Sequence, residues 1–266
     1  MKKTLLWQLR PRKGGPDSWL FGTMHVQDGR AFTRLGEAQE HISRCEVFAT
    51  EFDFSDLDQG AMAAALQLPE DTTLDQLLGR QAWKNLERYA RKHLGIPAEA
   101  LLHQHPMNVG ALLTAALMKE NAPASLDETL WQYARQQGIE TTGVETFAEQ
   151  IETLGKIPFE AHVKNLVWLL KNYNRQKSRL RKMLNRYAEG DIQKLYESAK
   201  REAKGMRRVL LYERNKIMAR RFAEIARERA LFCAVGAGHL AGEKGILRLL
   251  KKAGFIVKPV LPAPSK

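Results

Sequence analysis

"LFCAVGAGHL", residues 231–240, is an apolar run that ends at a glycine and meets a histidine three residues later. "SWLFGTMHV", residues 18–26, repeats this pattern near the start of the chain. A short apolar run of this kind is typical of a buried strand, and glycine permits the tight turn that follows it. The two stretches therefore predict two core strands, each placing a histidine, His25 or His239, just beyond its carboxyl end.

The rest of the chain predicts strands at its two ends and at two interior places, with helices between them. A Gly- and Pro-rich turn joins the first strand signal to residues 18–21, which indicates a hairpin. This order predicts an α/β fold with a central mixed β-sheet, strand-end Gly-x-x-His motifs and a large helical insertion at about residues 158–229, all in one domain over residues 1–266. The other strand signals lie at residues 4–9, 46–52, 138–145 and 254–260.

Two further strands end in a glutamate. "VFATE" places Glu51 at its end, and "TTGVE" places Glu145. Ligands of open α/β sheets bind beyond the carboxyl ends of the strands, and imidazole with carboxylate suits Mn, Fe, Co or Zn. A single His in this place is more often a hydrogen-bonded structural residue, and a single Glu is more often a helix cap or a solvated loop residue. The four together favour a divalent metal site, because a buried charge needs a partner.

Arg214 and Asn215 lie on a predicted helix of the insertion. Asn215 falls on the apolar stripe of that helix, so its amide is expected to be buried and hydrogen-bonded, either to a site residue or to the backbone. Arg214 either reaches a carboxylate or an anion in the cleft or is a solvated helix residue. The apolar positions of the stripe are Leu211, Met218, Phe222 and Ile225.

Three further residues are weaker candidates. Asp127 follows Ser125 at a predicted helix start, so either of them caps the helix, and Asp127 is also a candidate site member. His103 and His105 in "HQHP" form either a chelating pair or a polar loop. The chain has no Ser-His-Asp signature, no P-loop and no Gly-rich dinucleotide fingerprint.

Several of these segments together resemble the TraB/GumN/TIKI family over nearly the whole chain. The family resembles metal-dependent proteases, and its animal members trim a secreted signalling protein with Mn or Co. It is also related in fold to erythromycin esterase-like enzymes and to haem-binding ChaN proteins. The resemblance matches His25, His239, Glu51, Glu145, Arg214 and Asn215 to family positions. The segments that carry it are "WLFGTMHV", "ATEFD", "GVETFAEQI", "ERNKIMA" and "AVGAGHLAGEKGILRLLKKAGFIVKPV".

Many bacterial members of that family begin with an export signal, whereas "MKKTLLWQLRPRK" is interrupted by arginine too early to be one. No stretch is long enough to cross a bilayer. Cys45 and Cys233 lie in apolar runs, which predicts buried free thiols. We therefore expect a cytoplasmic protein.

The net charge of +12 is concentrated in one segment. Residues 171–221 contain 17 Lys and Arg against 5 Asp and Glu, which accounts for the whole excess. The segment predicts one basic surface, which is either a solvated helix face or a region that attracts acidic substrates or an anionic surface. Nucleic acid is disfavoured, because the tyrosines of the segment fall on apolar stripes.

These observations favour a metal-dependent hydrolase, in particular a peptidase acting on a peptide or another small acidic substrate. The resemblance favours Mn or Co as the metal, with Zn as a further candidate. One glutamate, Glu51 by preference over Glu145, is the expected general base. The alternatives are a haem or metal carrier without turnover and a binder of nucleic acid or anionic membrane. The predicted catalytic residues are Glu51, Arg214 and Asn215, and the predicted metal ligands are His25, His239 and Glu145.

Overall fold

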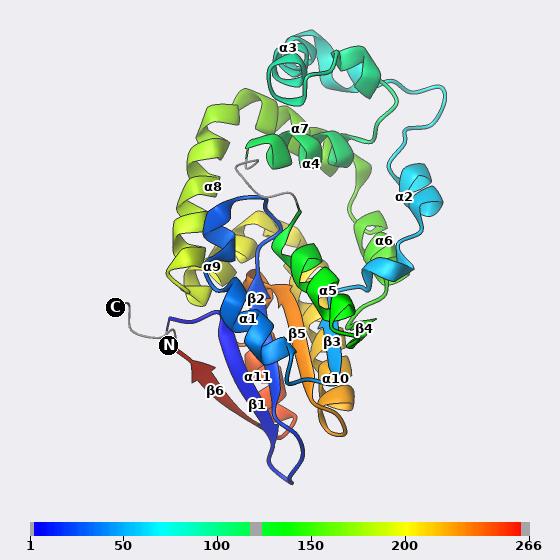
Figure 1. The fold of residues 1–266 in the computed structure, drawn as a ribbon. Helices are drawn as coiled ribbons and strands as arrows, with labels where there is room; N and C mark the ends of the chain where they lie inside the picture. The colour runs from blue at the N-terminus through cyan, green and yellow to red at the C-terminus, as the bar shows by residue number, and fades with distance from the viewer. Residues whose placement is uncertain (1–2, 118–123, 262–266) are drawn as a thin grey trace. The chain divides into compact units, whose positions relative to one another are not determined.

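The computed structural model, which describes residues 3–117 and 124–261, contains a six-stranded sheet in which four neighbouring strands are parallel and extend to one edge (Figure 1). The strand order is β4-β3-β5-β2-β1-β6. Strands β2, β5, β3 and β4 run parallel, and β1 is antiparallel to both β2 and β6. The predicted α/β fold with a mixed sheet and the predicted hairpin are confirmed. The strands are β1 (Leu6–Pro11), β2 (Ser18–Thr23), β3 (Val47–Thr50), β4 (Glu140–Gly143), β5 (Leu231–Gly236) and β6 (Phe255–Val260).

The described chain divides into two compact units. Unit 1 comprises Met1–Asp56, Asn121–Thr153 and Lys182–Lys266, and unit 2 comprises Leu57–Glu120 and Leu154–Arg181. Single-domain organisation, with an insertion at about residues 158–229, stays a prediction. Among the described residues, no helix is both long and apolar enough to span a membrane.

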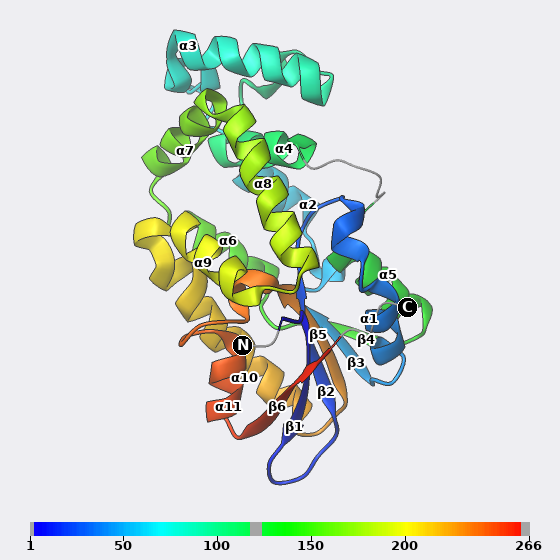
Figure 2. The same cartoon turned by 90° about the vertical axis from the view of Figure 1, so that its left-hand side faces the viewer.

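Helices cover both faces of the sheet in unit 1. Figure 2 shows α1 (Leu35–Ile42) and α5 (Leu126–Gln136) on one face, and α10 (Arg214–Ala226) and α11 (Ile246–Lys252) on the other. A sheet covered on both faces needs strands that are apolar throughout, which explains the continuous apolar runs that mark β2 and β5. Unit 1 also contains α6 (Phe147–Gly155) up to Thr153, α9 (Ile192–Glu202) and the second half of α8 (Tyr173–Ala188).

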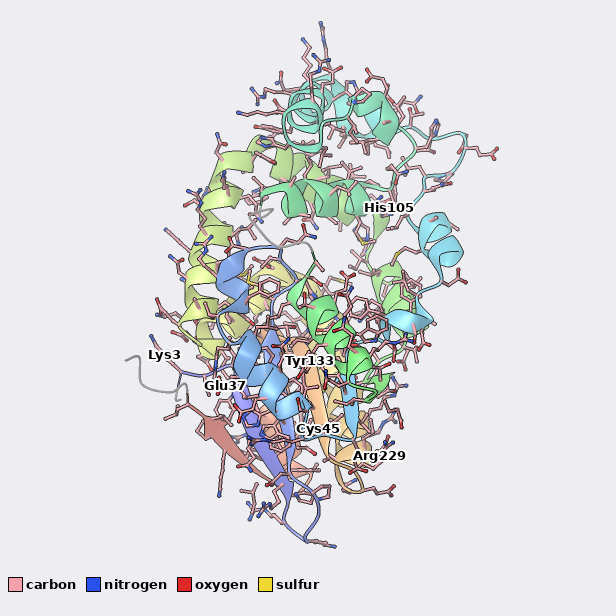
Figure 3. The ribbon with its side chains drawn as sticks, viewed as in Figure 1. Lys3, Glu37, Cys45, His105, Tyr133 and Arg229 are labelled. Carbon is pink, nitrogen blue, oxygen red and sulfur yellow. The ribbon has the colours of Figure 1, made fainter. Side chains whose placement is uncertain are left out.

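Aromatic rings fill the centre of the core. Phe232 on β5 stacks on Phe48 of β3, with ring centroids 6.0 Å apart, and contacts Phe21 of β2 at 6.1 Å. Both cysteines are buried free thiols, as predicted. Figure 3 labels one of them, Cys45, together with Tyr133, whose hydroxyl lies 2.9 Å from the hydroxyl of Ser43 and so connects α5 to the end of α1.

The helical character predicted for residues 158–229 is confirmed, and α8 and α9 are separated at Gly190, which has φ +68°. A further break separates α7 from α8 at Asn172. In the described parts of the chain, two π-helical turns interrupt the helices, one at Ala90–Leu94 and one at Arg208–Glu213, directly before α10. The helices of unit 2 are α2 (Gln59–Ala65), α3 (Leu74–Tyr89), α4 (Pro106–Leu117), α7 (Phe159–Lys171) and the first half of α8.

Candidate functional site at the strand ends

The carboxyl ends of β2, β3, β4 and β5 meet at one edge of the sheet, because these strands are parallel neighbours. Glu51 directly follows β3, and Glu145 lies two residues beyond β4. Their backbones are joined by a hydrogen bond from the Glu145 N–H to the Glu51 carbonyl, at 2.6 Å. Gly143 makes this approach possible, because a Cβ on it would lie 2.3 Å from the carbonyl oxygen of Glu145.

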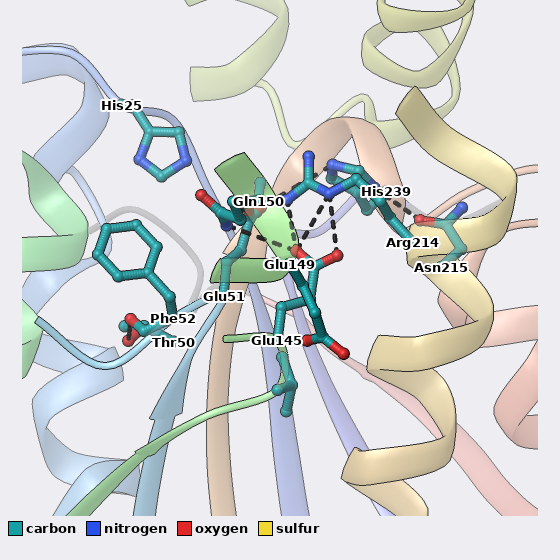
Figure 4. Close-up of polar contacts among 12 residues, drawn as sticks. His25, Thr50, Glu51, Phe52, Glu145, Glu149, Gln150, Arg214, Asn215 and His239 are labelled. Atoms are coloured by element: carbon teal, nitrogen blue, oxygen red, sulfur yellow. Dashed lines mark hydrogen bonds and ion pairs between the residues drawn. The ribbon is translucent and has the colours of Figure 1, made fainter. Parts of the chain in front are cut away.

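Arg214, the first residue of α10, joins the two carboxylates (Figure 4). Its Nη2 donates to Glu51 Oε2 at 2.7 Å and to Glu145 Oε2 at 2.6 Å, and its Nε donates to Glu145 Oε1 at 3.0 Å. The side chains are 17%, 10% and 2% exposed for Arg214, Glu51 and Glu145, respectively. Of the two alternatives for Arg214, the structure therefore shows the one in which its side chain reaches a carboxylate, and not a solvated helix residue.

The second oxygen of Glu51 faces β5. Glu51 Oε1 accepts a hydrogen bond from the Gly236 N–H at 2.9 Å. A Cβ on Gly236 would lie 3.2 Å from that oxygen, so the glycine lets the carboxylate approach the strand end. Burial raises the pKa of Glu51, but the attraction of His239, Arg214 and His25 and the hydrogen bond from Gly236 outweigh it, so the pKa lies well below its ordinary value.

His239 lies in the short turn after β5, and its two ring nitrogens face different partners. Asn215 Nδ2 donates to the Lys244 carbonyl at 2.7 Å, so Asn215 Oδ1 is the atom that lies 2.6 Å from His239 Nδ1. An amide oxygen only accepts, which places the proton on Nδ1 and leaves the lone pair of Nε2 free. His239 Nε2 lies 3.9 Å from Glu51 Oε1. Burial and Arg214 lower the pKa of His239 to about 4, so its ring is neutral at pH 7.

His25 stands apart from the cluster of Glu51, Glu145 and Arg214 (Figure 4). It lies in the loop after β2 with a side chain that is 58% exposed, and its Nδ1 is 2.9 Å from Asp127 Oδ2. Asp127 is buried in the first turn of α5 and accepts a hydrogen bond from Thr23 Oγ1. The charge of Asp127 raises the pKa of His25. The predicted cap of α5 is Ser125, whose hydroxyl accepts from the backbone N–H of Glu128.

Sequence inspection missed residues on α6 that support the site. Gln150 Nε2 lies 3.4 Å from both Glu51 Oε2 and Glu145 Oε2. Thr146 and Glu149 form a capping box at the start of α6. Arg221 of α10 donates two hydrogen bonds to the Glu149 carboxylate, from Nη1 to Oε2 at 2.6 Å and from Nη2 to Oε1 at 2.9 Å. The spacing Thr-x-x-Glu in "TFAE" was a signal for this cap.

The pair in "HQHP" belongs to unit 2 and lies outside this group of residues. His103 is exposed, and His105, labelled in Figure 3, accepts from the Met107 N–H at 3.2 Å at the start of α4. The His105 ring packs edge-on against His162 with centroids 5.0 Å apart. Because Nδ1 of His105 is occupied as an acceptor, the local backbone accounts for its orientation.

The donor chemistry at the strand ends fits a divalent metal. Two imidazoles and two carboxylates are present, and His239 presents a free Nε2 because Asn215 holds its other nitrogen, the arrangement found behind metal-ligating histidines. Within residues 3–117 and 124–261, no three His, Cys, Asp or Glu side chains are already gathered at metal-binding separation. Metal binding would therefore require these donors to move closer, and His25 is the one on an exposed loop.

A family model described as the TraB/PrgY/gumN family matches residues 5–259. The chain belongs to this family. The resemblance noted in the sequence is thus confirmed, and it covers both units.

Two metalloproteases are similar to the chain over nearly its whole length, at low identity. Metalloprotease TIKI2 of Danio rerio is 24% identical over 97% of this chain and 61% of its own length. Metalloprotease TIKI1 of Homo sapiens is 22% identical over 96% of this chain and 61% of its own length. The chain thus spans about three fifths of the length of these relatives. No solved structure matches the chain.

Proposed function

We propose that the chain is a metal-dependent hydrolase that acts on peptides. The observation that carries the proposal is the gap between His239 Nε2 and Glu51 Oε1. The two atoms face each other at 3.9 Å, and each is fixed from behind, by Asn215 and by the Gly236 amide. Their pKa values are both lowered, so both atoms present lone pairs at neutral pH. A pair of facing lone pairs suits a cation or a water molecule. The names of the TIKI relatives support a metalloprotease.

The metal ligands in this proposal are His239, His25 and Glu145. Asn215 Oδ1 accepts from Nδ1 of His239, which leaves a lone pair on Nε2 for the metal. His25 contacts Asp127 through Nδ1, and because the charge of Asp127 raises the pKa of His25 to about 9, this ring must release the proton on Nε2 when it binds the metal. Glu145 Oε1 receives one hydrogen bond, from Arg214 Nε, and so keeps a lone pair. Mn or Co is favoured and Zn is also compatible with this mixed nitrogen and oxygen set.

Glu51 is the proposed general base. A carboxylate whose pKa is held low is ionised and ready to accept a proton, but it is a weak base for ordinary water. A bound divalent metal would supply the missing acidity, since it lowers the pKa of a coordinated water to about 7. Glu51 Oε1 faces the gap beside His239, where it can take that proton.

Arg214 is the proposed stabiliser of negative charge on the substrate. Its contacts with Glu51 and Glu145 use Nε and Nη2, and among the described residues none uses Nη1. The Nη1 amino group is therefore available to a developing oxyanion, while the two carboxylates hold the guanidinium in place. Asn215 is a positioning residue, because it acts through His239.

Metal content and peptide cleavage test the proposal together. Protein stripped with chelator and reloaded with Mn, Co or Zn should bind one ion per chain and cleave members of a peptide library only when loaded. His239→Ala and His25→Ala should each lose tight binding, whereas His103→Ala, an exposed histidine of unit 2, should retain it. Full metal content in both site variants, or cleavage that persists in chelator, would contradict the proposal.

A further inference from the structure

A second group of charged side chains lines a cavity of about 530 Å³ that is open to the surface of unit 2, on α3 and the turn after it. Four of the lining residues are basic and exposed, and two are acidic. The lining therefore has a net charge of +2. The basic residues are Lys84, Arg88, Arg91 and Lys92, and the acidic residues are Glu87 and Glu99.

The helix geometry places these cations on one side. Lys84 and Arg88 are four residues apart on α3, and so are Arg88 and Lys92 across the π-helical turn Ala90–Leu94. Like charges at this spacing destabilise a helix by about 0.2–0.5 kcal/mol per pair. Glu87 offsets part of this repulsion, because it lies three residues after Lys84 and four residues before Arg91. The π turn ends at Gly95, which has φ +72°, and π turns occur frequently at functional sites.

Arg88 is held in place by neutral groups. Its Nη2 donates to the Tyr89 hydroxyl at 3.0 Å and to Asn85 Oδ1 at 3.3 Å, and its guanidinium lies 4.8 Å from the centroid of the Tyr89 ring. The Tyr89 ring in turn stacks on Tyr173 with centroids 4.1 Å apart. These contacts orient the guanidinium without neutralising its charge.

The other cations are not neutralised either. Among the described residues, Lys84, Arg88, Arg91 and Lys92 form no ion pair within 4.0 Å, although Glu87 and Glu99 line the same cavity. The pKa of His93, which follows Lys92, is lowered mainly by burial and further by the positive charges of Lys92 and Lys177. The cavity therefore lies in a region of net positive charge.

We propose that this cavity binds a small phosphate monoester. Arginine forks match the geometry of phosphate oxygens, and lysine adds a mobile positive charge. Glu87 and Glu99 would accept hydrogen bonds from hydroxyl or amino groups on the rest of the ligand. Their negative charges would repel a ligand with several phosphates in a row. A volume of about 530 Å³ suits a small molecule. The inference uses only residues of unit 2 and does not depend on the proposed hydrolase activity.

Calorimetric titration of the full chain with adenosine 5′-monophosphate, glucose 6-phosphate and inorganic phosphate tests the proposal, with adenosine as the uncharged control. We expect the two esters to bind more tightly than inorganic phosphate, and adenosine not to bind. Arg88→Ala and Arg91→Glu should each weaken ester binding about 10-fold or more, as expected for a lost charge-assisted hydrogen bond. Lys164→Glu, which reverses an exposed cation of unit 2 outside the cavity, should change it less than about twofold.

Three results would overturn the proposal. The first is an absence of binding by either ester to the wild-type chain. The second is an equal loss in Lys164→Glu and Arg91→Glu, which would show that the overall positive charge attracts the ligand. The third is binding to vesicles with anionic phospholipid, or to RNA, that the cavity variants abolish while no small ester binds. Thermal melting of each variant checks that it is folded, and the exposed positions should leave the melting temperature unchanged.

Discussion

The strand-end site of unit 1 and the basic cavity of unit 2 both contain arginine, but the arginine is paired with carboxylates in the first and with neutral groups in the second. Arg214 is largely buried, and two carboxylates accept its hydrogen bonds. Arg88 is exposed, and only neutral groups hold it. A buried charge must be paired inside the protein, whereas an exposed charge leaves its pairing to solvent or a ligand. We therefore expect Arg214 to contribute to stability as well as to the proposed hydrolysis, and Arg88 to contribute only to the proposed phosphate binding.

The largest expected difference between the two sites is in stability. Arg214→Ala leaves Glu51 and Glu145 buried side by side without their cation, which should lower the free energy of unfolding by about 3–5 kcal/mol. Arg88→Ala removes only exposed contacts and should change it by less than about 0.5 kcal/mol. Urea unfolding of both variants gives the two values.

Two variants refine this stability comparison. Arg220→Ala removes an exposed arginine of α10, whose nearest carboxylate is Glu224 at 3.8 Å, and should cost at most about 1 kcal/mol. Adding Glu51→Gln and Glu145→Gln to Arg214→Ala should recover part of the lost stability, because the uncompensated charges are then removed. Equal costs for Arg214→Ala and Arg88→Ala would contradict the distinction between the two sites.

The next expected effect is on metal affinity. Asn215→Ala removes the oxygen that holds His239 Nδ1, so the ring is free to rotate and change tautomer. Loss of such a supporting partner typically weakens metal binding by about 10–100-fold. Competition with a chromogenic chelator measures the affinity, and Asn165→Ala, on an exposed position of α7, is the control. Unchanged affinity in Asn215→Ala would show that His239 is not a ligand.

A smaller effect is expected from Gly236→Ala. The new methyl group would lie 3.2 Å from Glu51 Oε1 and push the carboxylate by a few tenths of an ångström. Displacement of a catalytic group on this scale should lower kcat about 10-fold. Gly155→Ala, at a glycine with open space around it, is the matched control and should retain full activity. A Gly236→Ala enzyme with normal kcat would place Glu51 outside the reaction.

The smallest effect concerns the basic residues between 171 and 221. Reversal of Lys177, Arg181 or Lys200 should lower kcat/KM for acidic peptides about threefold at low salt and leave kcat unchanged, because summed charge acts on association. The difference should vanish near 1 M salt, where the Debye length falls to about 3 Å. Steady-state kinetics at two ionic strengths would detect it. If kcat/KM depends neither on salt nor on these reversals, the basic segment is only a solvated surface.

Strands β2, β3 and β5 were predictable from sequence because each is a short apolar run bounded by glycine or polar residues. Strand β4, "ETTG", was predictable from its β-branched threonines and the glycines around it. Once β2, β3, β4 and β5 are parallel neighbours, the meeting of Glu51 and Glu145 at one edge follows from topology. The direction of the Arg214 side chain could not be predicted from this topology. Asn215 marks the buried face of the helix, but the residue next to it, Arg214, could point either to the core or to solvent. The contacts decide it: Arg214 reaches two carboxylates that are 163 and 69 residues away in sequence.

The exposure of His25 was also beyond sequence reasoning. Its Gly-x-x-His spacing equals that of His239, but the turn after β5 is a buried 3₁₀ helix, whereas the loop after β2 is open. The same local motif therefore gives one buried and one exposed histidine. Gln150 was missed for a different reason: its place depends on where α6 packs, and an isolated glutamine carries no sequence signal.

Glu51→Gln tests the central claim most directly, because it keeps the size of the side chain and removes its basicity. The protein should retain one metal ion per chain, since His239, His25 and Glu145 remain, and should lose about 10²–10⁴-fold in kcat, as expected for a missing general base. Metal content and peptide turnover are measured on the same preparation, with Glu224→Gln, at an exposed glutamate of α10, as the control. Turnover close to that of the wild-type enzyme in metal-loaded Glu51→Gln would contradict the account.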